Sequence, residues 1–216
     1  MLFSKRRGVI AVHHREPQAE VALTLGELGS ALREVNRFDE AKYAYREALD
    51  ILRVTQAQPS RDYVLTYGLL GKLELDRGHS AEAMRILNES LQLTRATQGP
   101  RHSDAAEILV AIGSTCRCMS DLGRAERAVR EAQEIYRAAT PELAPDRVAA
   151  DNAMGEVLLL QHRFDEAGIV LERTLAARQQ LFGSKGIPIS ETLNLLAGVR
   201  SGQERLEEDR RRCHLL

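Results

Sequence analysis

The chain has 216 residues and a formal net charge of -1 at pH 7, so its overall charge gives no general attraction to nucleic acid or to anionic membranes. A membrane-spanning helix needs about 20 consecutive apolar residues, and no stretch of this chain approaches that length. The apolar run after Lys5-Arg6-Arg7 is too short for a typical secretory signal. Three cysteines, an odd number, do not suggest a disulfide framework, which favours a reducing, cytoplasmic location.

Small residues recur along the chain with a fixed step of 42 residues. They are the glycines Gly29, Gly71, Gly113 and Gly155 and the alanines Ala41, Ala83, Ala125 and Ala167. Large apolar residues keep the same phase at offsets of three and four, which is typical of helices with one apolar face. A period of this size indicates stacked helical repeats. We interpret the eight small residues as packing positions, where missing side chains let two helices approach closely.

The repeat predicts pairs of helices, a helix A around each glycine and a helix B around each alanine. Helix A is expected near residues 19–35, 61–77, 103–119, 146–161 and 188–200, and helix B near 38–55, 80–97, 122–138, 164–181 and 203–212. Turn-forming residues such as Asn36, Pro59, Gly78 and Pro145 separate the helices.

The two ends continue the period in degenerate form. Phe3 lies 42 residues before Tyr45, and Pro17 lies 42 residues before Pro59, so residues 1–18 are expected to be a degenerate N-terminal half repeat, either a natural cap or part of a longer array. Four full repeats then occupy residues 19–187. Residues 188–216 are expected to form a degenerate fifth repeat and a charged C-terminal cap, because the run 204–212 is nearly all charged and cannot bury a face. No linker divides this predicted single array.

Two short segments carry a family resemblance. Phe38-Asp39-Glu40-Ala41 and Phe164-Asp165-Glu166-Ala167 resemble the start of helix B in the tetratricopeptide repeat, although Ser80 and Leu122 replace the aromatic residue in the middle repeats. The 42-residue step is similar to that of the kinesin light chain type, and the resemblance spans about residues 17–208. It implies an all-α fold, a tetratricopeptide-repeat superhelix (α-solenoid) of antiparallel helix pairs. It also implies a protein or peptide ligand. The resemblance does not identify that ligand, because such folds host many partners.

In such repeats we expect the ligand to bind on the concave surface. The helix A residues that point away from helix B would form this surface. The candidate peptide-binding groove consists of Arg33, Lys72, Val110, Arg117, Asn152, Glu156 and Asn194. Its cations could receive an acidic peptide, or they could be solvated charges only. Asn152 and Asn194 share a repeat phase, and an amide can bond both the C=O and the N–H of an extended peptide. In the resembling family an asparagine at this phase contacts ligand backbone, whereas the simpler interpretation is a polar residue on a wet helix face.

The sequence offers no catalytic constellation. Cys116 and Cys118 lack the two-residue gap of zinc or redox pairs, and Cys116 falls at a core position. There is no glycine-rich phosphate loop and no nucleophile elbow. We therefore expect no catalytic residue, no metal site and no cofactor. Cys213-His214-Leu215-Leu216 fits a loose prenylation form, but His214 is not aliphatic, and no membrane partner is expected apart from this motif.

These observations favour a non-enzymatic scaffold for protein–protein interaction that binds an extended peptide in its concave groove, with no nucleic-acid partner. Two alternatives stay open. One is a regulatory or sensor array that controls an attached or associated NTPase or kinase. The other is a structural scaffold that self-associates as a homo-oligomer.

Overall fold

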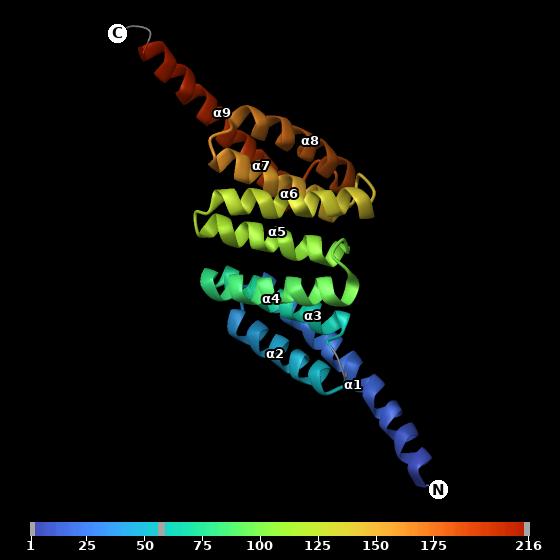
Figure 1. The fold of residues 1–216 in the computed structure, drawn as a ribbon. Helices are drawn as coiled ribbons and strands as arrows, with labels where there is room; N and C mark the ends of the chain where they lie inside the picture. The colour runs from blue at the N-terminus through green and yellow to red at the C-terminus, as the bar shows by residue number, and fades with distance from the viewer. Residues whose placement is uncertain (1–2, 56–58, 214–216) are drawn as a thin grey trace. The chain divides into compact units, whose positions relative to one another are not determined.

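The computed structural model describes the backbone of residues 3–55 and 59–213 and the side chains of residues 18–55 and 59–207. Within this part of the chain every regular element is an α-helix (Figure 1). The helices are α1 (Phe3–Glu34), α2 (Phe38–Thr55), α3 (Arg61–Asp76), α4 (Ser80–Gln98), α5 (Ser103–Cys118), α6 (Leu122–Ala139), α7 (Pro145–Leu160), α8 (Phe164–Phe182) and α9 (Ile187–Cys213). The predicted all-α architecture of helix pairs is confirmed.

The chain divides into two compact units, residues 1–100 and residues 101–216, whereas the sequence predicts one elongated array. In the first unit α1 packs against α2, α2 against α3, and α3 against α4. In the second unit the same order of neighbours runs from α5 to α9. Each unit is therefore a stack of helices in which sequence neighbours are also spatial neighbours.

The turn from helix A to helix B has the same geometry in all four repeats. Asn36, Gly78, Ser120 and His162 stand one period apart, and all have positive φ, between 59° and 80°. The next amide donates to the carbonyl oxygen five residues back, as from Arg37 N to Leu32 O at 2.9 Å. This pattern satisfies the last carbonyl groups of helix A and reverses the chain into helix B. Only Gly78 enters the left-handed region without the steric cost of a Cβ.

The four in-phase glycines lie where each helix A meets its helix B. A Cβ added at Gly71 would lie 2.8 Å from Leu87 Cγ, and one added at Gly113 would lie 2.6 Å from Val129 Cγ2. Gly29 contacts the Tyr45 ring in the same way, and Gly155 contacts Leu171. No side chain fits at these points, so the helices of a pair are in close contact.

Each unit has its own apolar core around these contacts. The four in-phase alanines are fully buried. One core of the first unit contains Ala41, Tyr45, Leu49, Leu70, Leu73 and Ile86. One core of the second unit contains Val129, Met154, Leu158, Phe164, Ala167, Leu171, Leu196 and Val199.

The helices at the two ends differ from the predicted pairs. α9 is continuous from Ile187 to Cys213, so the turn and the separate helix B expected after residue 200 are wrong. The physical reason is that the charged segment has no apolar face to fold back on α9, while its Glu and Arg residues favour helix continuation. α1 is likewise continuous from Phe3 to Glu34. The half repeat at residues 1–18 stays a prediction.

Replacing Gly71 with alanine should destabilise the protein, because the new Cβ would collide with Leu87, which is fully buried. We expect Gly71→Ala to lower the free energy of unfolding by about 1–3 kcal/mol. Gly123→Ala is the control, since a Cβ there meets only Arg127 Nη1 at 3.7 Å and alanine favours the helix. Urea unfolding of both variants checks this. Equal stability of Gly71→Ala and the parent would contradict the close pairing of α3 and α4.

Candidate peptide-binding surface

Successive A helices contact one another within each unit. α1 contacts α3 in the first unit, and α7 contacts both α5 and α9 in the second. Two of the seven predicted groove residues lie in the first unit, Arg33 on α1 and Lys72 on α3. The other five lie on α5, α7 and α9: Val110, Arg117, Asn152, Glu156 and Asn194. The second unit therefore carries most of the candidate surface on three neighbouring helices.

Two of the predicted groove cations already have carboxylate partners. Arg33 Nη1 lies 3.1 Å from Asp76 Oδ2, and Arg117 Nη1 lies 3.4 Å from Glu156 Oε1. Both pairs join one helix A to the next, and their side chains are 25% to 41% exposed. Lys72 is half-buried and also has an interaction partner. The paired charges leave little net attraction for an acidic peptide at Arg33 and Arg117.

The two asparagines of equal phase lie in different surroundings. Asn152 is half-buried on α7, and its Oδ1 accepts a hydrogen bond from Thr192 Oγ1 of α9 at 2.9 Å. Asn194 is exposed on α9, and no side chain in the described part of the chain bonds its amide. Asn194 therefore keeps a donor pair and an acceptor for a ligand, whereas Asn152 keeps only its Nδ2 donors.

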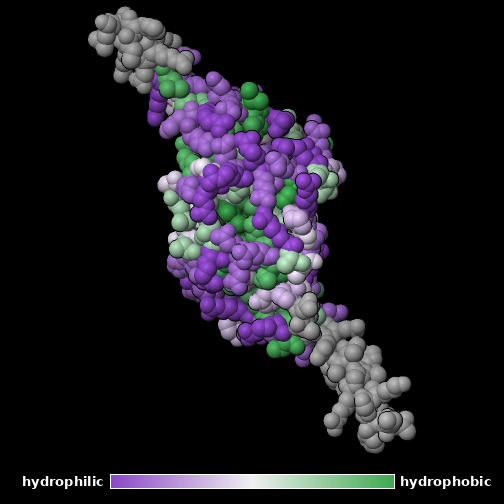
Figure 2. Space-filling view, viewed as in Figure 1, coloured by the Kyte–Doolittle hydropathy of each residue, from purple (hydrophilic) through white to green (hydrophobic). Residues whose placement is uncertain are grey.

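An apolar hollow lies on the same face of α9 as Asn194. Gly198 and Ser201 follow Asn194 by four and seven residues, which places them on one side of the helix. Both line a hollow of about 560 Å³, together with Leu159, Leu160, His162, Phe164, Gly202, Arg205 and Leu206. Polar side chains cover most of the visible surface, and apolar ones show only in small groups between them (Figure 2). A hollow of this lining beside a free amide is suited to an apolar side chain of an extended peptide.

Sequence reasoning missed Arg178, which positions Asn152. Leu52, Thr94, Tyr136 and Arg178 share one repeat phase, and all four are buried, with Arg178 only 7% exposed. The Arg178 guanidinium donates to Thr192 Oγ1 at 2.9 Å and to the Pro188 carbonyl oxygen. Since Thr192 in turn bonds Asn152, the arginine holds α8, α9 and α7 in one polar network. Its signal in the sequence is a charge at a position that is uncharged in the other repeats.

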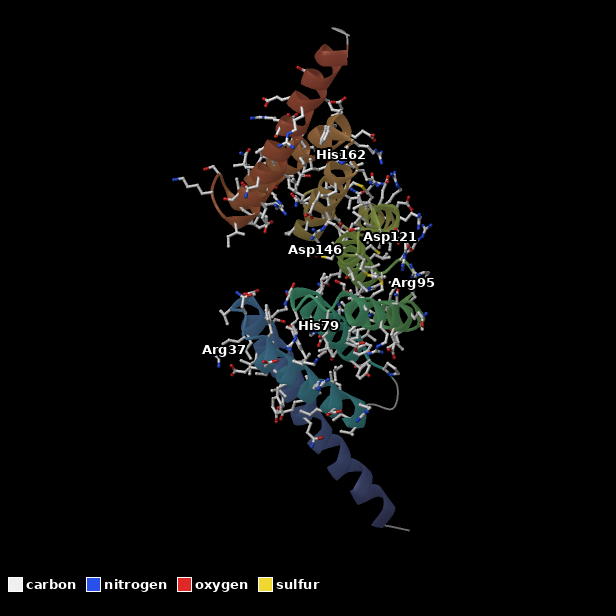
Figure 3. All side chains as sticks on the ribbon, turned by 90° about the vertical axis from the view of Figure 1, so that its left-hand side faces the viewer. Arg37, His79, Arg95, Asp121, Asp146 and His162 are labelled. Atoms are coloured by element: carbon white, nitrogen blue, oxygen red, sulfur yellow. The ribbon has the colours of Figure 1, made fainter. Side chains whose placement is uncertain are left out.

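Glu74 is a second buried charge at a core position, where the other repeats have Leu32, Cys116 and Leu158. Its carboxylate lies 2.6 Å from Lys42 Nζ and 2.7 Å from His79 Nδ1, and His79 is labelled in Figure 3. Burial by itself raises the pKa of the Glu74 carboxyl, but the hydrogen bonds from Lys42 and His79 outweigh it and hold the pKa below its ordinary value. Glu74 is therefore an ionised structural group that joins α3 to α2.

Cys116 is a buried thiol, as the sequence predicts. Burial raises its pKa, which disfavours the thiolate. Among the described side chains no three His, Cys, Asp or Glu residues come together to hold a metal ion. No helix in the described part of the chain is long and apolar enough to cross a membrane. The motif at residues 213–216 lies outside the described side chains.

A polar cluster at Glu126 joins two repeats of the second unit. Its carboxylate accepts hydrogen bonds from Gln161 Nε2 and Arg163 Nη1, each at 3.0 Å, and from Arg130 of its own helix. The bond from Gln161 and those from Arg163 and Arg130 lower the pKa of Glu126 to about 2, against the opposing effect of burial. The cluster therefore links α6 to the turn between α7 and α8.

The stability that Glu126 contributes should depend on pH. Because its folded pKa lies below the ordinary 4.5, the contribution is complete above pH 4.5 and is lost as the pH falls toward about 2. We expect Glu126→Gln to be less stable than the parent by roughly 1–3 kcal/mol at pH 7. The difference should vanish near pH 2. Urea unfolding across this range tests it, with the exposed Glu172→Gln as the control, and a difference that does not change with pH would contradict the assignment.

Comparison with known proteins identifies the family. Models of the tetratricopeptide repeat match residues 21–55, 56–138 and 146–208. The chain belongs to the tetratricopeptide repeat family. This confirms the resemblance drawn from the helix B signatures and the 42-residue step. A search of curated protein sequences found no match.

Several solved structures of tetratricopeptide-repeat-like proteins are similar to this chain. BtubC (BKLC) from P. vanneervenii is 21% identical with a TM-score of 0.76, and the match covers 93% of this chain and 80% of that chain. A putative kinesin light chain from Podosopora anserina with nearly identical TPR-like repeats is 14% identical with a TM-score of 0.69, covering 90% and 91%. The yeast histone chaperone Hif1 is 12% identical with a TM-score of 0.60, covering 90% and 98%. At such identities the likeness shows the fold, an all-α tetratricopeptide-repeat architecture.

Proposed function

We propose that this tetratricopeptide repeat protein is a non-enzymatic interaction scaffold that binds an extended peptide segment of a partner protein along the A helices of its second unit. The observation that carries the proposal is the free amide of Asn194 beside the apolar hollow of α9. A peptide backbone at Asn194 would find both a donor and an acceptor. An apolar side chain one or two residues along would reach the hollow.

The charges at Arg33 and Arg117 do not favour an acidic peptide at those two positions. Arg117 is paired with Glu156, and Arg33 with Asp76, so a ligand carboxylate would have to compete with an existing partner. The Nδ2 of Asn152 supplies a second donor from the neighbouring helix, held in place by Thr192. The ligand is therefore bound mainly through its backbone groups and through one apolar side chain.

The scaffold role is supported by the family and by the chemistry of the described side chains. Hif1, which shares the fold, is described as a scaffold protein recruiting protein complexes to core histones, and that description concerns Hif1 itself. In this chain the buried charges Glu74 and Arg178 bond to groups on neighbouring helices. The Cys116 thiol is buried with a raised pKa, which makes it a poor nucleophile.

The binding site is tested by capturing a partner with the purified chain, mapping the bound peptide, and titrating that peptide calorimetrically. Asn194→Ala should weaken binding by about 1–3 kcal/mol, because it leaves two peptide groups unpaired. Gln179→Ala removes an exposed amide from helix B of the same unit and is the matched control.

A second variant, Leu160→Asp, places a charge in the hollow and should also weaken binding while the melting temperature is kept, since Leu160 is 42% exposed. Unchanged affinity in both Asn194→Ala and Leu160→Asp would contradict the proposed site.

A further inference from the structure

α1 carries an exposed stripe that has no partner among the described residues. Its members are Val21, Thr24, Leu28 and Ala31, with Val35 directly after the helix, and all five are exposed. Val21, Leu28 and Val35 are 51%, 49% and 62% exposed. The spacing of three and four residues keeps them on one side of the helix. We call this set the α1 stripe.

The positions of Thr24, Leu28 and Ala31 are buried in each of the other three repeats. Leu28 has the phase of Leu70 and Met154, which are 7% and 5% exposed. Leu70 lies in one core with Ala41 and Tyr45 of α2, the helix B before α3. In the described part of the chain α1 packs only on α2 and α3, which follow it. The α1 stripe is therefore the face on which a preceding helix B would pack.

A helix B sequence stands at residues 3–16. Phe3 has the phase of Tyr45, and Val9 and Ile10 have the phases of Ile51 and Leu52. These residues form the N-terminal part of the same continuous helix, which runs on past α2 and α3 (Figure 1). Two parts of one continuous helix cannot pack on each other. A second copy of the chain can bring its residues 3–16 to the stripe without breaking the helix.

The charges of the two parts of α1 are complementary. Residues 3–16 contain four cations, Lys5, Arg6, Arg7 and Arg15, and one anion, Glu16, so their net charge is +3 with neutral histidines. Beside the stripe stand three exposed carboxylates seven residues apart, Glu20, Glu27 and Glu34. Antiparallel pairing of two α1 helices sets the basic part of each beside Glu20 and Glu27 of the other.

From the stripe, the helix B phase of residues 3–16 and these charges, we infer that two copies of this chain form a symmetric dimer through antiparallel α1 helices. In this arrangement residues 3–16 of each copy cover Val21, Thr24 and Leu28 of the other copy's α1 stripe, in the place of a preceding helix B. In the cores of the first unit, Tyr45 lies with Leu70, and Ile51 lies with Tyr63. The same register sets Phe3 of one copy opposite Leu28 of the other, and Val9 opposite Val21. The interface is isologous, because each copy gives and receives the same segment.

The first test measures the mass of the full chain by light scattering and sedimentation over a range of concentrations. We expect a dimer of twice the 24.1 kDa chain mass. Leu28→Glu should raise the concentration at which the dimer dissociates by more than tenfold. Val54→Glu is the matched control, because Val54 is 73% exposed on α2 outside the stripe, and it should leave the dimer intact. A monomeric parent, a larger assembly, or a Leu28→Glu protein that dimerises like the parent would overturn the inference.

The second test places one cysteine in each part of α1, as Phe3→Cys with Leu28→Cys, in a chain that also carries Cys118→Ser and Cys213→Ser. Mild oxidation should give a covalent dimer on a non-reducing gel. Each single cysteine variant should give much less, because like positions lie far apart across the two-fold axis. A cross-link within one chain would show that residues 3–16 fold back on their own stripe, and it would overturn the dimer. The absence of any cross-link, in a variant that keeps the parental helix content, would also overturn it.

Discussion

The close contact between the two helices of each repeat is the constraint on which the rest of the structure depends. Glycine inside a helix costs roughly 1 kcal/mol relative to alanine. Each of the four glycines faces a fully buried side chain of helix B: Tyr45, Leu87, Val129 or Leu171. Burial of such a side chain contributes about 1.5–3 kcal/mol, which exceeds the cost. The short distance within each pair then fixes which face of every helix A is left for other contacts.

Most of the helix arrangement could be predicted from the sequence because it follows from one period. The small residues, the apolar residues around them and the turns at Asn36 and Gly78 all repeat with it. The left-handed residues Ser120 and His162 were not recognised from their residue types, although they share the repeat phase of Asn36 and Gly78. The period also did not predict that α1 and α9 are continuous helices. A periodic pattern indicates where a helix would pack, but whether the chain turns there depends on the partner surface available.

The candidate site was predicted less completely, because it depends on pairings across helices that the sequence does not display. The phase of Asn152 and Asn194 places both on A helices, but the bond from Thr192 to Asn152 requires the register of α9 on α7. The pairing of Arg117 with Glu156 has the same origin. Comparing equivalent positions between repeats would have found Glu74 and Arg178. Each is a charge at a position that is uncharged elsewhere, and each is buried with partners that offset the loss of hydration.

Each repeat is held by its sequence neighbours, so that a unit needs no distant part of the chain to fold. The most direct measurement is circular dichroism and thermal unfolding of residues 1–100 alone, the first compact unit. Nearest-neighbour packing predicts a helical fragment with a cooperative unfolding transition. A fragment that is disordered, or that melts without cooperativity, would contradict the claim.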